Sequence, residues 1–420
     1  MSGGRRRLGH VVDILYLILV LLVVTRVFAE LAERVHVPAI VGELMSGVGL
    51  GLVLKSFHDQ APVLWSATQS ETYVSIVDLG MFFLMLLAGI RMEPLDFART
   101  SKSAIFVALG GMAVPVAAGL ALGAVVLPES PMKLVQSLFL GVALAITAVP
   151  VAVRVFLDVG QLETRVGKTV IAAALWDDLI SLFLLSLLIA AMSSGGLGGF
   201  TGSEALHLLG KVALFFAVTI PVGLFVFPLV GRYFRYLRFP EVDFSMLLIA
   251  ALAYATFAER MDMHFIIGAF LAGMFFHPKV VDPEIYERVE EQMSGITRGF
   301  LAPIFFVSVG LHLDFSALAS TPVFVIVLIT IAVLSKLVGA GLPAYWVGMS
   351  KPEAMMVGVG MSGRGAVELI VAGVALQAGL FLHPSPPPPI VSSLYSSIVI
   401  MALVTTVLTP LLLRRLVGRS

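Results

Sequence analysis

Two neighbouring carboxylates in the middle of an apolar segment are the strongest chemical signal in the sequence. Asp177 and Asp178 occur in the stretch AALWDDLISL, whose other side chains are uncharged. Charges inside hydrocarbon are costly and are functional candidates for that reason. Successive residues of a helix point about 100° apart. We therefore expect one carboxylate to line an aqueous cavity while its neighbour reaches another helix.

A single basic side chain lies near the middle of a second apolar segment. Lys336 stands in AVLSKLVGAG, and an isolated ammonium is untenable in lipid, so we expect it to pair with Asp177 or Asp178. A cation that enters beside the carboxylates displaces their protons, and competition of this kind for one site is an exchange mechanism. The alternative is a static ion pair that holds two spans together.

One apolar segment has the features of a broken helix. Pro150 lies in the middle of GVALAITAVPVAVRVF, where it removes a backbone donor and frees the carbonyl of Ile146. Thr147 adds a hydroxyl group beside that carbonyl. A simple kink without an ion site is the alternative interpretation.

A second segment, VGVGMSGRGAVELIV, is rich in glycine around Ser362 and Arg364. Glycine at this density suits an unwound stretch, and non-helical backbone at membrane depth is tolerated only within protein or beside a cavity. Close packing between helices is the alternative reason for the glycines. Arg364 and Glu368 are four residues apart, so they can pair on one helix face and support the break.

These residues must be positioned by helices that cross a membrane. The sequence is 59% hydrophobic and 13% charged, whereas soluble domains carry about a quarter of charged residues. Because one crossing takes roughly 20 apolar residues, we predict an all-α polytopic membrane protein with about 13 transmembrane helices. The predicted spans are 11–31, 38–54, 72–91, 103–127, 134–156, 164–193, 206–230, 243–258, 262–277, 294–312, 321–347, 353–380 and 390–413.

The charges and the absence of cysteine exclude several other classes of protein. Lys and Arg number 27 and so do Asp and Glu, and there is no cysteine, so neither a nucleic-acid-binding face nor a disulfide framework is expected. The distribution of Lys and Arg among the loops predicts a C-terminus in the cytoplasm and an N-terminus outside. The expected location is a bacterial type of inner membrane. The basic run 5–7 argues against an outside N-terminus, so an arrangement with twelve spans stays open.

The two broken segments are the fifth and the twelfth predicted spans. They are seven spans apart, as are the fourth and eleventh and the sixth and thirteenth. An offset of seven reverses the orientation in the membrane, so the two halves are expected to be inverted repeats. Interrupted helices at corresponding positions of such repeats indicate an ion site near the middle of the membrane.

Several of these stretches resemble the monovalent cation:proton antiporter-2 family, and the resemblance extends over essentially the whole chain. The block TAVPVAVRVFLDVGQLETRVGKTVIAAALWDD at 147–178 is the most specific of them. The other matching parts are VPAIVGELMSGVGLG (37–51), LGMFFLMLLAGIRME (79–93), FIIGAFLAGM (265–274), PIFFVSVGLHLD (303–314), Lys336 and GMSGRGAVEL (360–369).

The resemblance implies the sodium/proton antiporter fold, with inverted repeats, two broken helices that cross, and a homodimer. It implies a panel or dimerisation domain at 11–91 and 243–312. A core ion-transport domain is implied at 103–193 and 321–413, with a linker helix at 206–230.

The resemblance also implies roles for individual residues. Asp178 matches the ion-binding carboxylate, Asp177 the second carboxylate of the electrogenic type, and Lys336 its membrane lysine. Asp178, Asp177 and Thr147 are expected to hold the monovalent cation. The unwound crossing is expected at Thr147, Ala148, Pro150, Ser362 and Gly363, with support from Arg364 and Glu368.

The expected function is a secondary antiporter that exchanges Na⁺, or K⁺ or Li⁺, for protons by alternating access, with a role in pH homeostasis. No resident cofactor is expected. An ion channel lacks support because no repeated filter sequence is present. An intramembrane aspartyl protease needs its aspartates on different helices. A sodium-coupled symporter of an organic anion on the same architecture is the alternative.

Overall fold

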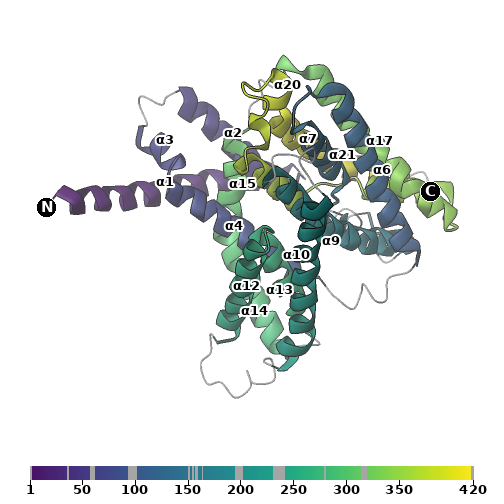
Figure 1. Cartoon of the computed structure of the whole chain (residues 1–420), viewed down its shortest axis with the longest axis horizontal. Helices are drawn as coiled ribbons and strands as arrows, with labels where there is room; N and C mark the ends of the chain where they lie inside the picture. Colours follow the sequence, from purple (N-terminus) through teal and green to yellow (C-terminus); the bar gives the residue numbers. More distant parts are fainter. Residues whose placement is uncertain are drawn as a thin grey trace. The chain divides into compact units, whose positions relative to one another are not determined.

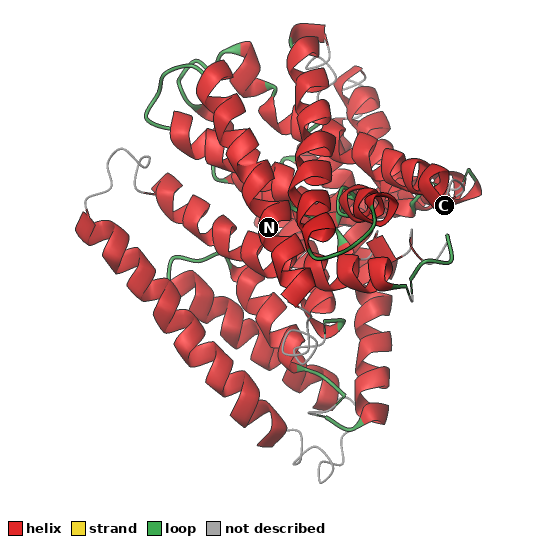
Figure 2. Ribbon diagram, turned by 90° about the vertical axis from the view of Figure 1, so that its right-hand side faces the viewer, coloured by secondary structure: helices red, strands yellow, loops and turns green. Residues whose placement is uncertain are grey.

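The computed structural model describes residues 2–35, 37–56, 62–92, 102–149, 152–153, 156, 159–162, 164–193, 202–229, 242–278, 281–313 and 319–417. Every regular element within these ranges is a helix (Figure 2). The prediction of an all-α protein is therefore confirmed.

Nine helices in the described ranges are long and apolar enough to cross a membrane. They are Val12–Arg34, Glu71–Ile90, Lys102–Val126, Arg165–Ile189, Gly210–Leu229, Val242–Arg260, Pro283–Leu311, Pro322–Trp346 and Leu394–Val417. The shorter apolar helices are Ala39–Leu54, Lys133–Ala145, Phe265–Phe275 and Ala366–Gln377. Each of these helices corresponds to one predicted span, and the short ones include the parts of the two spans that were expected to be broken.

The chain forms two compact units, and the first comprises Met1–Arg91, Thr219–Phe257 and Phe265–Leu313. Its elements are α1 (Ser2–Arg34), α2 (Ala39–Ser56), α3 (Pro62–Thr68), α4 (Glu71–Ile90), η2 (Val222–Val226), most of α12 (Val242–Arg260), α13 (Phe265–Phe275), α14 (Pro283–Ile296), η3 (Thr297–Leu301) and α15 (Ala302–Leu311). Figure 1 labels the α-helices among them. η2 and η3 are short π-helices.

Small residues let the helices of the first unit approach closely. A Cβ atom at Gly89 of α4 would overlap the backbone of Phe270 in α13, and one at Gly273 would overlap the backbone of Leu86. Small residues that fit against each other's backbones in this way are typical of helix pairs in membranes. Close packing holds such helices together there, because lipid tails are as apolar as the side chains and no hydrophobic force drives the helices together.

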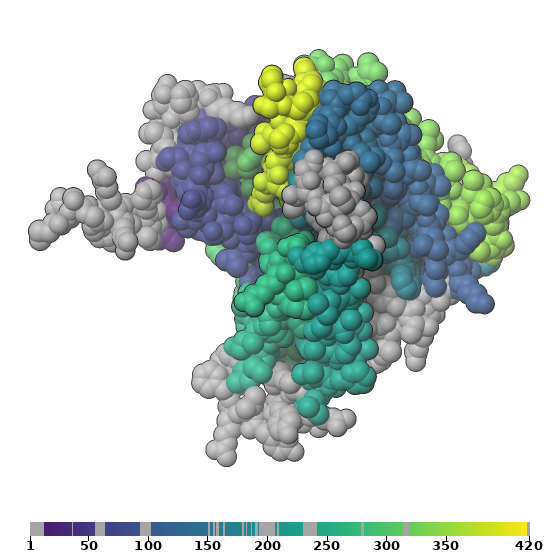
Figure 3. Space-filling model, in the orientation of Figure 1, coloured from purple at the N-terminus to yellow at the C-terminus, as the bar shows by residue number. Residues whose placement is uncertain are grey.

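The second unit comprises Met92–Val218, Ala258–His264 and Asp314–Ser420. Its elements are α6 (Lys102–Val126), α7 (Lys133–Ala145), α9 (Arg165–Ser193), α10 (Gly202–Pro221, mostly in this unit), α17 (Pro322–Trp346), α18 (Lys351–Gly360), α19 (Ala366–Gln377), η4 (Leu380–Leu382), α20 (Pro389–Ser392) and α21 (Leu394–Val417). Figure 3 shows α6, in blue, at the surface beside α17, in light green.

Helix α6 joins the other helices of the second unit, because it packs on α7, α9 and α17. Gly119 of α6 meets the backbone of Gly141 in α7, and Gly110 of α6 meets the backbone of Gly339 in α17. Charged side chains are also buried in this unit, namely Asp177, Asp178, Lys336, Arg364 and Glu368. Buried charges are energetically costly in a membrane protein and therefore occur where they are paired or functional. This cluster of five residues is the candidate site.

Candidate ion-binding site

The first break in a helix follows α7. This helix ends at Ala145, and Ile146 is extended with φ −62° and ψ 137°. Residues 146–148 are outside any helix, and Ile146, Thr147 and Ala148 are all buried. Pro150, which predicted this break, lies outside the described residues. The break itself is where the sequence placed it.

The second break separates α18 from α19. Helix α18 ends at Gly360, and α19 begins at Ala366 after Gly365, which is fully extended with φ −167° and ψ −152°. The residues between the two helices, 361–365, are all buried. The glycine-rich motif therefore corresponds to an unwound stretch, and its glycines also allow contact: a Cβ atom at Gly358 would overlap the backbone of Leu337.

The two breaks lie against each other and are joined by their backbones. The amide of Ala148 donates to the carbonyl of Gly363 at 2.9 Å. The hydroxyl of Thr147 lies 2.9 Å from the carbonyl of Met361. Backbone groups released from helical hydrogen bonding at one break thus find partners at the other, which satisfies them without water.

Arg364 holds the end of α7. Its guanidinium donates to the carbonyls of Ala143 at 2.9 Å and Leu144 at 2.6 Å, and also to the carbonyl of Ile146. The last carbonyls of a helix lack partners within the helix and carry partial negative charge. A fully buried guanidinium with several donors therefore both satisfies these oxygens and balances their charge.

Glu368 lies beside Arg364 in the first turn of α19. The Nε atom of Arg364 is 3.6 Å from Oε2 of Glu368, and both side chains are 0% exposed. A carboxylate is favourable near the start of a helix. The structure therefore brings both predicted supporting residues to the crossing, where Arg364 binds one broken helix and Glu368 belongs to the other.

A buried triad connects the first break to two further helices. Nζ of Lys336, from α17, lies 2.6 Å from Oδ2 of Asp177 in α9 and 2.8 Å from Oγ1 of Thr147. Oγ1 of Thr147 is 2.7 Å from the same Oδ2 atom. All three residues are 0% exposed. Of the two aspartates that the sequence offered as partners for Lys336, the structure selects Asp177.

Asp178 lies next to the triad without sharing its ion pair. It is 4% exposed, and within the described part of the chain its Oδ1 atom is buried with no hydrogen-bond partner. The Oδ1 atom of Asp177 is likewise buried with no hydrogen-bond partner among the described residues. The 100° offset between neighbouring helical residues explains why one carboxylate faces Lys336 and the other does not.

The charges of this cluster do not balance when all groups are ionised. The three carboxylates of Asp177, Asp178 and Glu368 face the two cations of Lys336 and Arg364, all of them buried. Within the described residues there is no group of three or more His, Cys, Asp or Glu side chains that could hold a metal ion. The groups available to a cation here are carboxylate, hydroxyl and backbone carbonyl oxygens, and oxygens of this kind are the ligands of hard cations.

The remaining predicted residue of the crossing has a different contact. The hydroxyl of Ser362 donates to the carbonyl of Gly358, 2.9 Å away in the last turn of α18. Ser362 thus caps the C-terminal end of α18. It is not a member of the triad formed by Lys336, Asp177 and Thr147.

Several residues of this region were not expected from the sequence. The carbonyl of Met361 accepts from Thr147, and Thr406 of α21 donates to the carbonyl of Arg364 at 3.1 Å. Gln136 in α7 donates to the carbonyls of Leu380 and His383 at 2.9 and 2.7 Å. Polar side chains inside apolar segments were the available signal for Gln136 and Thr406, whereas a backbone carbonyl leaves no trace in a sequence.

Comparisons with known proteins identify the family to which the chain is similar. The family model described as "Sodium/hydrogen exchanger, transmembrane" matches residues 17–418. The Na(+)/H(+)-K(+) antiporter GerN of Bacillus cereus is 30% identical over 409 residues, which are 97% of this chain and 97% of that protein. The Na(+)/H(+) antiporter of Enterococcus hirae is 29% identical over 361 residues, covering 86% of this chain and 89% of that one.

A solved structure shares the fold. The sodium proton antiporter MjNhaP1 of Methanocaldococcus jannaschii at pH 8 matches with a TM-score of 0.72, at 18% sequence identity, over 96% of each chain. The predicted antiporter fold is therefore confirmed.

Proposed function

This chain belongs to the sodium/hydrogen exchanger family, and we propose that it is a secondary antiporter that exchanges a monovalent cation for protons across a membrane. The observation that carries the proposal is the fully buried contact between Lys336, Asp177 and Thr147 at the crossing of two broken helices. Asp178 adds a second carboxylate directly beside it.

In the state without a bound cation, the ammonium of Lys336 neutralises Asp177. The hydrogen bonds from Lys336 to Asp177 and Thr147 use two of the ammonium's N–H donors and one oxygen, Oδ2, of the carboxylate. A buried ion pair is tolerated when its remaining polar atoms are also satisfied. Protons on Asp178 and Lys336 are the ones that this state can release.

Cation binding then competes with these protons. The buried Oδ1 atoms of Asp177 and Asp178 have no partner among the described residues, and they supply the charged ligands for a cation. The oxygen of Thr147 and carbonyls at the crossing supply neutral ones. A cation at this position repels the ammonium of Lys336 and favours loss of the protons, so cation and protons occupy the site in turn.

Transport requires that the site open to one side of the membrane at a time. We assign this movement to the core formed by 103–193 and 321–413, with 11–91 and 243–312 as the panel and 206–230 as the linker. Two proton carriers per cation make the exchange electrogenic. We further propose a homodimer in a bacterial type of inner membrane, with the C-terminus in the cytoplasm and the N-terminus outside.

Sodium is the cation that we propose first. The names of the relatives from Bacillus cereus and Enterococcus hirae both specify Na(+)/H(+) antiport, and the former also specifies K(+). A symporter of an organic anion does not require a lysine paired with Asp177, and the relatives named here are described as antiporters.

The test is proton flux in proteoliposomes with an imposed pH gradient and a fluorescent pH indicator. Addition of Na⁺, Li⁺ or K⁺ should dissipate the gradient with wild-type protein and not with Asp178→Asn. Glu30→Gln is the matched control, because Glu30 is an exposed carboxylate that pairs with Arg34 on its own helix. If no monovalent cation moves protons through the wild-type protein, the antiporter proposal is wrong.

A further inference from the structure

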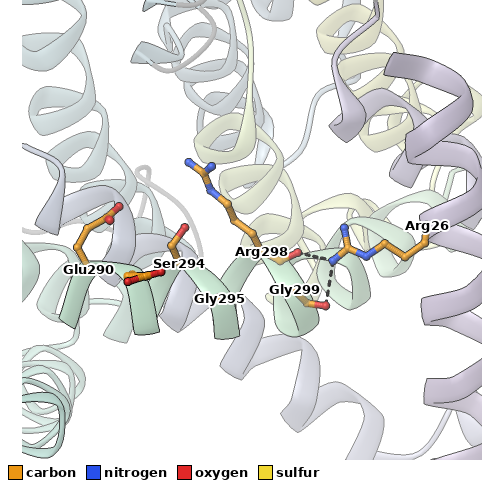
Figure 4. Close-up of a pocket in the computed structure, with 7 residues that line it drawn as sticks. Arg26, Glu290, Ser294, Gly295, Arg298 and Gly299 are labelled. Atoms are coloured by element: carbon orange, nitrogen blue, oxygen red, sulfur yellow. Dashed lines mark hydrogen bonds between the residues drawn. The ribbon is translucent and has the colours of Figure 1, made fainter. Parts of the chain in front are cut away.

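The first unit contains a shallow hollow of about 480 Å³, wide open to its surroundings, beside the π-helix η3 (Figure 4). Its lining comes from α1, the second half of α14 and η3. It contains charged side chains of both signs, which distinguishes it from an ordinary lipid-facing groove. The proposed ion site lies in the other unit and uses none of these residues.

Arg26 fixes one wall of the hollow. Its Nη2 atom donates to the carbonyl of Arg298 at 2.5 Å and to that of Gly299 at 2.9 Å, as the dashed lines in Figure 4 show. Its Nη1 atom lies 3.8 Å from the carboxylate of Glu43. A π-helix shifts the regular hydrogen-bond pattern and is often found at functional sites. Arg26 thus holds the π-helix in place.

The floor of the hollow is made of small residues. Ser294, Gly295 and Gly299 line it, and a Cβ atom built on Gly295 or Gly299 would meet nothing within 4 Å. The surface there is open, and an added group could lie directly against the helix backbone.

Opposite charges flank this floor. Glu291 and Arg298 are both exposed and are seven residues apart, which is about 10 Å along a helix. In the described part of the chain, neither side chain has an ion pair or a hydrogen bond. Glu290 is different, because it pairs with Arg91 at 2.5 Å. Figure 4 shows Arg298 extending from the helix on the same side as Glu290 and Ser294.

The hollow lies where the helical segment from α14 to α15 changes from charged to apolar residues. The exposed positions of α14 before it include Glu284 and Glu287, whereas α15 after it is apolar and nearly all buried. On the other wall, Arg26 is eight residues before Arg34, so it is about 12 Å from the end of α1. The exposed side chains of α1 change in this region from apolar at Leu15, Leu19 and Val23 to charged at Arg26, Glu30 and Arg34, as those of a helix do at the level of the lipid headgroups.

We propose that this hollow binds the headgroup of a zwitterionic aminophospholipid, with its phosphate on Arg298 and its ammonium on Glu291. The bidentate guanidinium suits a phosphate group, and the carboxylate accepts hydrogen bonds from a primary ammonium. An anionic headgroup without an amine is repelled by Glu291, and a quaternary ammonium has no N–H group to donate. The preferred lipid is therefore phosphatidylethanolamine over phosphatidylglycerol or phosphatidylcholine.

The test is native mass spectrometry of the purified full chain, titrated separately with these three lipids. We expect wild type to retain phosphatidylethanolamine roughly tenfold better than the other two, as one charge-assisted hydrogen bond implies. Arg298→Gln should lose this retention. Glu291→Gln should remove the preference, so that phosphatidylglycerol is retained at least as well. Arg34→Gln, an exposed arginine on the same unit, should behave as wild type.

Equal retention of the three lipids by wild type, or unchanged retention by Arg298→Gln, would overturn the proposal. Occupation of the hollow by a second copy of the chain would also overturn it. The chain has no cysteine, so Gly295→Cys gives a single thiol at the floor of the hollow. A disulfide between copies that forms equally with and without lipid would show that occupant, whereas the proposal predicts that phosphatidylethanolamine suppresses it.

Discussion

The ion pair between Lys336 and Asp177 allows a quantitative test by a double-mutant cycle. The variants are Lys336→Met, Asp177→Asn and the combination of both. Lys336 loses two hydrogen bonds in the first variant, to Asp177 at 2.6 Å and to Thr147 at 2.8 Å. Because both members of the pair are 0% exposed, water cannot replace the partner that is removed.

The expected magnitudes follow from this burial. Removing one partner of a buried ion pair typically lowers the free energy of unfolding by about 3–5 kcal/mol, since an uncompensated charge remains. Removing both leaves neutral groups, so the double variant should be destabilised by much less than the sum of the two. We expect a coupling free energy of roughly 2–3 kcal/mol, at the upper end of what neighbouring residues show.

The assay is unfolding of purified protein in detergent at one pH and without the transported cation. The control cycle uses Arg34 and Glu30, an exposed pair four residues apart on α1 whose side chains are 71% and 63% exposed. Exposed pairs contribute about 0–1 kcal/mol. If the effects of Lys336→Met and Asp177→Asn were simply additive, the two residues would not form the pair that the transport scheme requires.

Three further predictions concern the crossing and its supporting helices. Arg364→Gln should lower the free energy of unfolding by at least about 3 kcal/mol, because Glu368 and the carbonyls at the end of α7 lose a buried cation. Unfolding of the purified protein in detergent measures this change. A free energy of unfolding equal to that of wild type would contradict the capping role of Arg364. Gly119→Leu should lower the free energy of unfolding by roughly 1–3 kcal/mol or more, because a side chain at this position overlaps the backbone of α7. Gly210→Leu is the control: a side chain at Gly210 meets open space, so this variant should unfold like wild type in the same assay. Thr147→Val should raise the cation concentration needed for half-maximal proton flux, and Thr147→Ser should restore it; equal flux in both variants would exclude a ligand role for the hydroxyl.

Much of the fold could be predicted from the sequence, because lipid imposes strict rules on composition and length. Apolar segments of sufficient length marked each spanning helix. The two breaks could also be located, since Pro150 removes a backbone donor and the density of glycine around Ser362 favours an unwound stretch. The prediction of antiport came from a resemblance and from the charges within the spans.

The details of the site could not be predicted, because they depend on where helices distant in sequence meet. Two aspartates were equally available to Lys336, and only the rotation of α9 decides between them. Arg364 could be expected to pair with Glu368 from their spacing. Its contacts with the carbonyls of Ala143, Leu144 and Ile146 depend on the crossing itself, and carbonyls have no signature in sequence.

Competition between sodium and protons at the carboxylates is the central claim, and binding of radioactive sodium to purified protein over a range of pH tests it most directly. We predict that bound sodium falls as pH falls in wild type, that Asp178→Asn binds almost none, and that Glu30→Gln behaves as wild type. Sodium binding that is independent of pH, or that persists in Asp178→Asn, would contradict the claim that one site serves both ions.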